Sequence, residues 1–368
     1  MKKNIRTILM VLFVLIIAVS MYIVTRGSYL EYKELGEKYI SVFKTNVRYQ
    51  YYIMGINFVI TFIIMYFSNK GIKKGLKVFF DEEKKEMPKL VNKSISFVIA
   101  VISSVIVGIL FTPKVILYAS NVSFEKTDLI FNLDISFYMF VEPLIKMILK
   151  YLMGMFIFLI IYTIVYYIFV LNRNLDGVDR ETLKKSYLIK HIITNIRILS
   201  IIYAIYTLVG TLDIVFSGFI TTSSKLQLTG AGLTDITIKL WGNIILAIVI
   251  VVSVFLATAN IKKENKSGTI KNLLIIPAYM VCMFIVMFGF NIIFVNSNKY
   301  DKEKEYIERN ISYTKEAYGI NLEDETIEYS GTITTDEIKA NKKGFYDKYE
   351  YEYNNNNGEL IFFCKWRY

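Results

Sequence analysis

The sequence is poor in the side chains on which most catalytic and metal sites depend. Its 368 residues include one histidine, His191, and two cysteines, Cys282 and Cys364. Nucleophilic sets of the Ser-His-Asp or Cys-His kind, and the common zinc sites, combine several such side chains. We therefore predict no catalytic set, no metal site and no cofactor. Enzyme activity stays open, but we favour a protein that is not an enzyme.

Charged residues make up 20% of the chain but are almost absent from seven long apolar stretches, and 54% of all residues are apolar. Each stretch has about 18 to 25 residues, which is the length a helix needs to cross ~30 Å of hydrocarbon. Because the apolar runs are continuous and do not alternate, they indicate helices and not barrel strands. The predicted spans lie near residues 7–24, 50–68, 94–111, 146–170, 198–216, 241–259 and 273–295.

Lysine and arginine are distributed unevenly between the connections of these spans. The segments on the N-terminal side of the membrane contain 21 of them, and the loops on the other side contain 9. Since positive charge is retained in the cytoplasm, the N-terminus is expected inside and the C-terminal tail outside. We predict a multi-pass protein of the plasma membrane. The first span is too long for the apolar core of a cleaved signal peptide, so we interpret it as an uncleaved anchor.

The net charge of +11 belongs to the membrane part of the chain. Residues 296–368 contain 11 basic and 15 acidic side chains. The excess of positive charge therefore lies where the distribution rule for membrane proteins expects it, and we predict no nucleic-acid binding. The partners we expect are the lipid bilayer and another membrane or extracytoplasmic protein.

The fold class that follows is an all-α polytopic membrane protein with a short extracytoplasmic α/β tail. We predict a seven-helix membrane domain over residues 1–295, the start of an extracytoplasmic domain over 296–345 and a disordered tail over 346–368. In the second of these, Ile307 and Ile311 share a helix face and Gly319 can end the helix, which predicts an amphipathic helix. A strand and a short helix are expected after it.

Asp213 is the only acid inside a predicted span, and burying an unpaired carboxylate in lipid is expensive. It is therefore a candidate functional residue. In one interpretation it lines a polar path for an ion or a proton together with Asn57 and Asn291. In the other it forms a structural pair with a lysine of an outer loop, such as Lys225.

Asp134 lies in the segment FNLDISFYMF, residues 131–140, where polar and apolar residues alternate. A lone strand at a bilayer surface has no partner, so we favour Asp134 as the N-cap of a short interfacial helix. Pro143 would mark the turn into the fourth span, from which Lys146 and Lys150 would extend outward. An acid-base pair of Asp134 with Glu142 is the less favoured alternative.

Two more outer segments have patterns that can be interpreted locally. LTGAGLTD, residues 228–235, has two glycines but lacks the Lys-Ser/Thr ending of a phosphate loop. We expect a turn in which Thr234 or Asp235, our third candidate residue, is an N-cap. Residues 28–43 have the spacing of an amphipathic helix that lies on the outer membrane face.

Four of these segments together resemble Uncharacterised Protein Family 0182, large bacterial integral-membrane proteins of unassigned activity. They are LGEKYISVF, FNLDISFYMFVEPL, GAGLTDITIKL and VNSNKYDKEKEYIERNISYTKEAYGI, and they stand in the order of the family. The resemblance extends to about Phe345. It implies a protein of the bacterial plasma membrane, with a seven-span membrane half followed by a long extracytoplasmic half. We expect this chain to be a short or truncated member that lacks most of the second half.

Two functions are compatible with these observations. The first is a membrane anchor or platform for an extracytoplasmic domain or partner. The second is a transporter or channel component that uses Asp213. The spans lack the charges near the bilayer centre and the Gly/Pro interruptions that mark many substrate sites, which favours the first function.

Overall fold

A computed structural model describes residues 2–88, 90, 92–174, 187–220, 227–320 and 336. The long helices in these ranges are α1 (Lys2–Leu35), α2 (Glu37–Glu82), α3 (Asn92–Ala119), α4 (Glu142–Asn174), α6 (Leu188–Thr211), α7 (Leu240–Lys262), α8 (Lys266–Phe290) and α9 (Lys299–Ala317). Short π-helical turns cover Phe137–Val141, Asp235–Lys239 and Asn291–Val295, and 3-10 turns cover Leu212–Phe216 and Asn296–Asn298. Between α6 and α7, strands β1 (Gly218–Ile220) and β2 (Gln227–Thr229) pair antiparallel, with Gly218 opposite Thr229.

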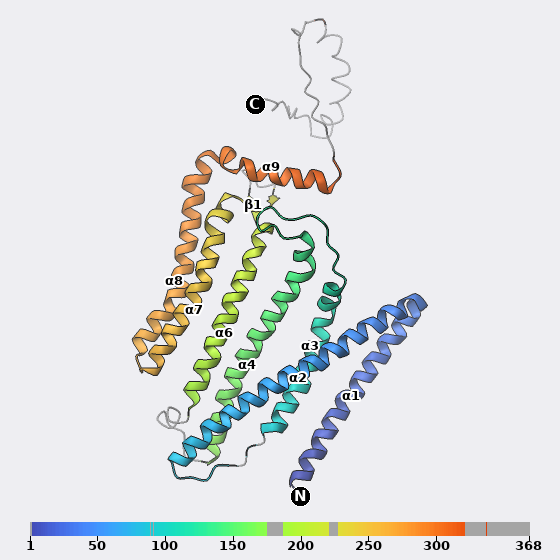
Figure 1. Cartoon of the computed structure of the whole chain (residues 1–368), viewed down its shortest axis with the longest axis vertical. Helices are drawn as coiled ribbons and strands as arrows, with labels where there is room; N and C mark the ends of the chain where they lie inside the picture. Colours follow the sequence, from blue (N-terminus) through green and yellow to red (C-terminus); the bar gives the residue numbers. More distant parts are fainter. Residues whose placement is uncertain are drawn as a thin grey trace, which may run out of the picture. The chain divides into compact units, whose positions relative to one another are not determined.

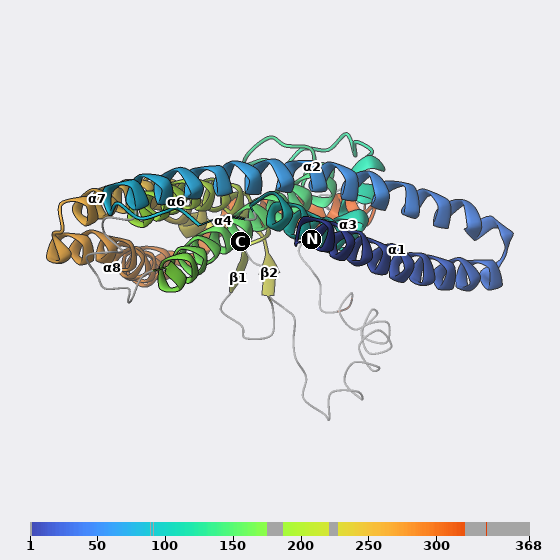
Figure 2. The same ribbon diagram turned by 90° about the horizontal axis from the view of Figure 1, so that it is seen from below.

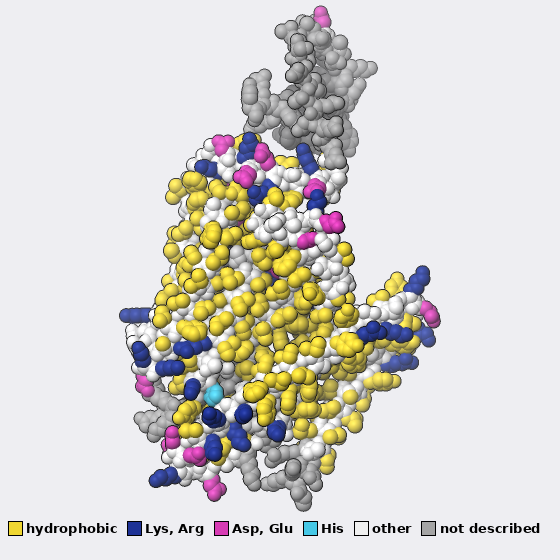
Figure 3. Space-filling view, viewed as in Figure 1, with side chains coloured by type: hydrophobic (Ala, Val, Ile, Leu, Met, Phe, Trp, Pro, Cys, Tyr) yellow, Lys and Arg dark blue, Asp and Glu magenta, His cyan; other side chains and the backbone are white. Residues whose placement is uncertain are grey.

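Within the described ranges, seven helical runs are long and apolar enough to cross a membrane. Each of the seven predicted spans falls inside one of them, so the predicted all-α membrane fold is confirmed at this level. The runs are Thr7–Leu35, Glu37–Glu82, Asn92–Ala119, Phe137–Arg173, Leu188–Phe216, Asp235–Lys262 and Lys266–Ala317. Their middles are hydrophobic on the face that Figure 3 shows, and charged side chains gather toward their ends.

The chain divides into two compact units, Met1–Ser312 and Tyr313–Tyr368. In the first unit α4, α6, α7 and α8 stand side by side in chain order, and each contacts the next (Figures 1 and 2). Helix α2 packs along α3 and runs obliquely to that row, while α1 mainly contacts α2. We call the end of this bundle at which α9 lies the α9 end, and the other the opposite end.

The described part of the second unit is the last turn of α9 and its ending. Gly319 has a φ of +63°, which glycine adopts without strain. The Ile320 N–H donates to the Lys315 carbonyl at 2.8 Å, as in a Schellman ending. The predicted cap at Gly319 is confirmed. The strand, the short helix except residue 336, and the disordered tail that the sequence predicts lie outside the described residues.

The segment 28–43 is helical, but the single helix expected there is wrong because it is interrupted at Gly36. Helices α1 and α2 both continue through this segment and are separated only at Gly36, whose φ is +124°. The two helices form a hairpin whose tip is packed by Phe43 against the rings of Tyr29 and Tyr32, with centroids 5.6 Å apart in both pairs. With 46 residues, α2 is about 69 Å long and exceeds the ~30 Å hydrocarbon thickness.

Helices approach closely where one of them has a glycine. A Cβ at Gly108 of α3 would lie 2.2 Å from Cγ of Met54 on α2. At Gly242 of α7, a Cβ would lie 2.7 Å from Cε of Met283 on α8, and the nearby Tyr279 hydroxyl donates to the Gly242 carbonyl at 2.9 Å. Small residues serve membrane helices in this way, because close backbone approach increases van der Waals contact.

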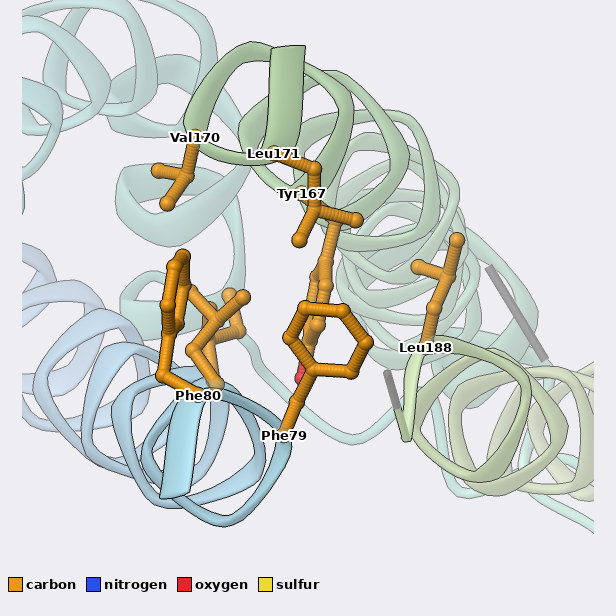
Figure 4. Close-up of a cluster of buried hydrophobic side chains, with 8 residues drawn as sticks. Phe79, Phe80, Tyr167, Val170, Leu171 and Leu188 are labelled. Carbon is orange, nitrogen blue, oxygen red and sulfur yellow. The ribbon is translucent and has the colours of Figure 1, made fainter. Parts of the chain in front are cut away.

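The opposite end of the bundle has an apolar cluster, drawn in Figure 4. Its side chains come from the end of α2, the end of α4 and the start of α6. They are Ile72, Leu76, Phe79, Phe80, Tyr167, Val170, Leu171 and Leu188, all buried. Three helices that are distant in sequence thus share one apolar core at this end.

Beside this cluster, neutral polar groups join α2 and α4 to α3. Asn69 of α2 donates to Ser96 Oγ of α3 at 2.9 Å and accepts from the Tyr162 hydroxyl of α4 at 2.7 Å. Asn92 donates to the Asn69 carbonyl at 2.9 Å and accepts from the Tyr166 hydroxyl at 2.6 Å. Buried polar groups are therefore paired here without any formal charge.

Candidate functional site

The three candidate acids Asp134, Asp213 and Asp235 all lie at the α9 end, but each has its own partners. The ring of Tyr138, which follows Asp134, lies edge-on to Phe216 at 5.3 Å between centroids. The Ser217 hydroxyl, next along the chain, donates to Asp235 at 3.2 Å. Neighbouring segments therefore carry the three acids, and no hydrogen bond or ion pair between described residues links one of these carboxylates to another.

A charge cluster joins α4 to the end of α6. The Lys146 ammonium lies 2.5 Å from both carboxylate oxygens of Asp213 and 2.8 Å from Oε1 of Glu142. Glu142 is buried, whereas 55% of the Asp213 side chain is exposed. One ammonium is thus shared by two carboxylates. The Lys146 ammonium is the counter-ion that permits the burial of Glu142.

This cluster changes three expectations from the sequence. The lysine that pairs with Asp213 is Lys146 and not Lys225, and Lys225 lies outside the described residues. Lys146 does not extend outward, because its ammonium turns to the two carboxylates. Pro143 marks no turn either, since Phe137–Val141 continues without a break into α4. The proline lies just after the π-helical turn inside this continuous helix, where it has no backbone N–H to donate.

Asp134 is the N-cap that the sequence predicts. Its carboxylate accepts the backbone N–H of Ser136 at 2.7 Å and that of Phe124 at 3.2 Å, and it also accepts the Ser123 hydroxyl. The hydrogen bonds from Ser123 and Ser136 hold the pKa of the Asp134 carboxyl well below its usual range. The carboxylate is occupied as a structural acceptor and is separate from the Lys146 cluster that contains Glu142.

Asp128, which sequence reasoning missed, organises the same loop. Its buried carboxylate accepts the N–H groups of Ile130, Phe131 and Leu133 at 2.7 to 2.9 Å. It also accepts the Tyr138 hydroxyl at 2.8 Å. An aspartate followed closely by its own backbone donors is a local turn signal, so this role was available in the sequence.

Asp235 is not an N-cap, because the helix that leads into α7 begins at Leu233. Its carboxylate reaches back to the Gly232 N–H at 3.2 Å, as the third helical residue does in a capping box. It also forms an ion pair with Lys239 at 3.1 Å, and Lys239 donates to the Ser217 hydroxyl at 2.9 Å. The predicted turn is present, with the acid two residues into the helix.

The same turn is joined to α9 by Glu303. This glutamate is 2% exposed, and its Oε2 accepts the Leu233 N–H at 3.1 Å. Both carboxylate oxygens lie within 3.2 Å of the position that a Cβ atom on Gly232 would occupy, so a side chain there would require the carboxylate to shift by a few tenths of an ångström. Two of the resembling segments, GAGLTDITIKL and VNSNKYDKEKEYIERN, therefore meet at a single buried carboxylate.

Asn57 and Asn291 are not brought together with Asp213. Asn57 lies between α2, α3 and α4, where it donates to Ser103 Oγ at 3.1 Å and accepts from the Tyr151 hydroxyl at 2.8 Å. Asn291 faces Thr234 at 3.5 Å near the end of α8. The described part of the chain contains no group of three or more His, Cys, Asp or Glu residues arranged to hold a metal ion.

Comparison with known proteins places these features in a family. A family model described as Uncharacterised protein family (UPF0182) matches residues 5–347. A UPF0182 protein of Caldicellulosiruptor saccharolyticus is 26% identical and aligns with 92% of this chain and 38% of its own length. A UPF0182 protein of Clostridium acetobutylicum is 30% identical, with 93% and 39% covered. The chain thus spans about two fifths of these relatives. No solved structure matches it.

Proposed function

Because the chain belongs to the uncharacterised protein family UPF0182, we propose that it is a membrane anchor and platform for an extracytoplasmic domain or partner protein. The proposal includes the orientation that its lysines and arginines predict, with the N-terminus in the cytoplasm and the α9 end outside the plasma membrane. Residues 1–295 are then the membrane domain, and the segment from residue 296 begins the extracytoplasmic part.

The observation that carries this proposal is the contact of Glu303 with Leu233. A helix that only linked two parts of a chain would need no buried carboxylate. Here the first turns of α9 are fixed to the turn before α7 by a charge-assisted hydrogen bond, which is stronger than a neutral one. The start of the segment that follows the membrane domain is thereby fixed to the bundle, which supports the platform proposal.

The orientation is tested by labelling with a membrane-impermeant maleimide in intact cells. Cys364 belongs to the C-terminal tail, and Cys282 lies inside the predicted seventh span. In a Cys282→Ser background, we expect Cys364 to react in intact cells. A Lys77→Cys, Cys364→Ser variant should react only after permeabilisation. The opposite labelling pattern would refute the proposed orientation.

A second function is supported by the shared ammonium of Lys146. Two carboxylates and one lysine between spans form the kind of charged group that can take part in ion or proton transfer in membrane proteins. As a transporter or channel component, the chain would move an ion past Asp213. As a platform, it needs no such movement.

Flux measurements separate the two functions. The wild-type chain and an Asp213→Asn variant are reconstituted into vesicles, and the movement of protons, Na⁺, K⁺ and Cl⁻ is followed with ion-sensitive dyes. The platform proposal predicts no flux above empty vesicles for either protein. A wild-type flux that Asp213→Asn abolishes would establish the transport function and contradict the platform proposal.

A further inference from the structure

A groove of about 790 Å³ opens at the opposite end of the bundle, between the start of α6, the end of α7 and the start of α8. Ile193, Ile261 and Ile270 contribute its apolar wall. Ile193 is buried and Ile270 is largely exposed, so the wall runs from the interior to the surface. A groove of this size is within the range of pockets that bind small organic molecules.

The rim of the groove is basic. Lys190 comes from α6, Lys262 from α7 and Lys266 from α8, so each wall contributes one ammonium. Among the described residues none of the three lysines has an ion-pair partner, and Glu264 is the one acid found in the described lining. Figure 3 shows lysine and arginine side chains gathered near the turn from α7 to α8.

We propose that this α6–α7–α8 groove binds one anionic phospholipid. The apolar wall takes an acyl chain, and the three ammonium groups take the phosphate of the headgroup. A soluble anion would make no use of the isoleucines, and a zwitterionic lipid would leave an excess of positive charge beside its own amine. Basic pockets between membrane helices bind anionic headgroups in this way.

One backbone N–H at the start of α8 is already occupied. The Asn265 side chain caps this helix by accepting the Gly268 N–H at 2.9 Å. The proposal assigns recognition of the headgroup to the lysine side chains. The inference rests on the membrane location in the proposed function, and the leaflet follows from the proposed orientation.

The test uses the full chain, purified in detergent and freed of lipid, with native mass spectrometry as the readout. Phosphatidylglycerol and phosphatidylethanolamine with the same acyl chains are added at equal concentrations. We expect phosphatidylglycerol to be retained at one molecule per chain, well above phosphatidylethanolamine. Equal retention of the two lipids would overturn the proposal.

Two variants examine the two halves of the groove. Each lysine contributes about a fivefold factor in lipid affinity. A triple variant that combines Lys190→Gln, Lys262→Gln and Lys266→Gln should therefore lower phosphatidylglycerol retention at least tenfold. Ile270→Trp places a larger side chain on the apolar wall and narrows the groove without changing its charge. It should also lower the retention of phosphatidylglycerol. If Ile270→Trp retained the lipid as the wild type does, the groove would not be the site.

A matched control removes the same charge from the same end of the bundle. The control variant combines Lys70→Gln, Lys73→Gln and Lys74→Gln, three lysines of α2 that do not line the groove. This triple variant should retain phosphatidylglycerol like the wild type, and an equal loss would show general charge attraction in place of a site. Thermal unfolding without lipid checks that every variant folds.

Inorganic phosphate distinguishes a lipid headgroup from a free anion. At millimolar concentration it should leave the bound phosphatidylglycerol in place, because it lacks the acyl chain. Displacement by phosphate, with phosphate adducts replacing lipid adducts, would assign the lysines to a soluble anion and overturn the lipid proposal. The maleimide labelling that tests orientation is independent of all these readouts.

Discussion

The two ends of the bundle are held together by different kinds of polar contact. At the opposite end, Asn69 and Asn92 exchange hydrogen bonds with serine and tyrosine side chains, and every group is neutral. At the α9 end, the Glu142 carboxylate forms an ion pair with the Lys146 ammonium, and the carboxylates of Asp134 and Glu303 accept hydrogen bonds from hydroxyl or backbone N–H groups. Neutral networks keep their bonds over a wide range of pH and salt, whereas carboxylates can be protonated. The contacts whose strength depends on pH therefore lie at the α9 end.

The largest effect is expected from breaking the charge cluster. Lys146→Met leaves the buried Glu142 without its counter-ion, so the free energy of unfolding in detergent should fall by about 3 kcal/mol. Asp213 contributes little to this loss because it is largely exposed.

Lys150→Met is the matched control for the charge cluster. Its ammonium lies 5.9 Å from the centre of the Tyr206 ring, a contact worth less than about 1 kcal/mol. Adding Glu142→Gln to Lys146→Met should restore part of the stability, since a neutral amide replaces the unpaired charge. Equal losses for the two lysine variants would contradict the assigned role of Lys146.

A somewhat smaller loss is expected from the neutral network. Asn69→Leu removes three side-chain hydrogen bonds between helices, each worth about 0.6 kcal/mol in membrane proteins, or roughly 2 kcal/mol together. The loss should be the same at pH 5 and pH 8 in chemical unfolding, because no group involved is charged. Asn291→Leu, whose one contact is at 3.5 Å, should change stability by less than about 0.5 kcal/mol. A pH-dependent loss for Asn69→Leu would break the contrast between the ends.

The contact of α9 should be weaker still. Glu303→Ala removes the acceptor of the Leu233 N–H and should lower stability by about 1.5 kcal/mol. Glu303→Gln keeps an acceptor oxygen without charge, so its loss of stability should be about half that of Glu303→Ala. If α9 detaches locally, the rate of limited proteolysis within it should rise from the wild type to Glu303→Gln and again to Glu303→Ala. Glu308→Ala changes an exposed acid on the same helix and should leave both measurements unchanged.

The smallest effect concerns pH at Asp134. Because its pKa in the folded chain lies below the ordinary value of 3.8, its hydrogen bonds stabilise the fold above about pH 4. That contribution is lost as the pH falls through the folded pKa. The Tm of Asp134→Asn should thus lie below that of the wild type at pH 6, and the difference should shrink below pH 4. A Tm difference between the two proteins that grows as the pH falls would contradict this prediction.

Features decided by neighbouring residues could be predicted from the sequence. The seven apolar runs follow from the thickness of a bilayer, and Asp134 and Gly319 are caps that act within a few residues of themselves. Asp235 was placed at the correct turn but at the wrong helical position. The break at Gly36 was missed because residues on both sides of it have a helical pattern, and a single glycine was the only signal.

Features that depend on contacts between helices could not be predicted. Asp213 and Lys146 are 67 residues apart, and Leu233 and Glu303 are 70 apart, so both pairs require knowledge of which helices adjoin. One signal for Glu303 was present all the same. It lies four residues before Ile307 and eight before Ile311, on the apolar face of α9, where a carboxylate needs a partner.

The central claim, that α9 is fixed to the bundle by Glu303, is tested most directly by hydrogen exchange at the Leu233 amide. Exchange is followed by mass spectrometry on the full chain in detergent, with peptides that resolve this position. We predict a protected amide in the wild type, faster exchange in Glu303→Gln and the fastest exchange in Glu303→Ala. An amide that exchanges equally fast in all three proteins would contradict the claim.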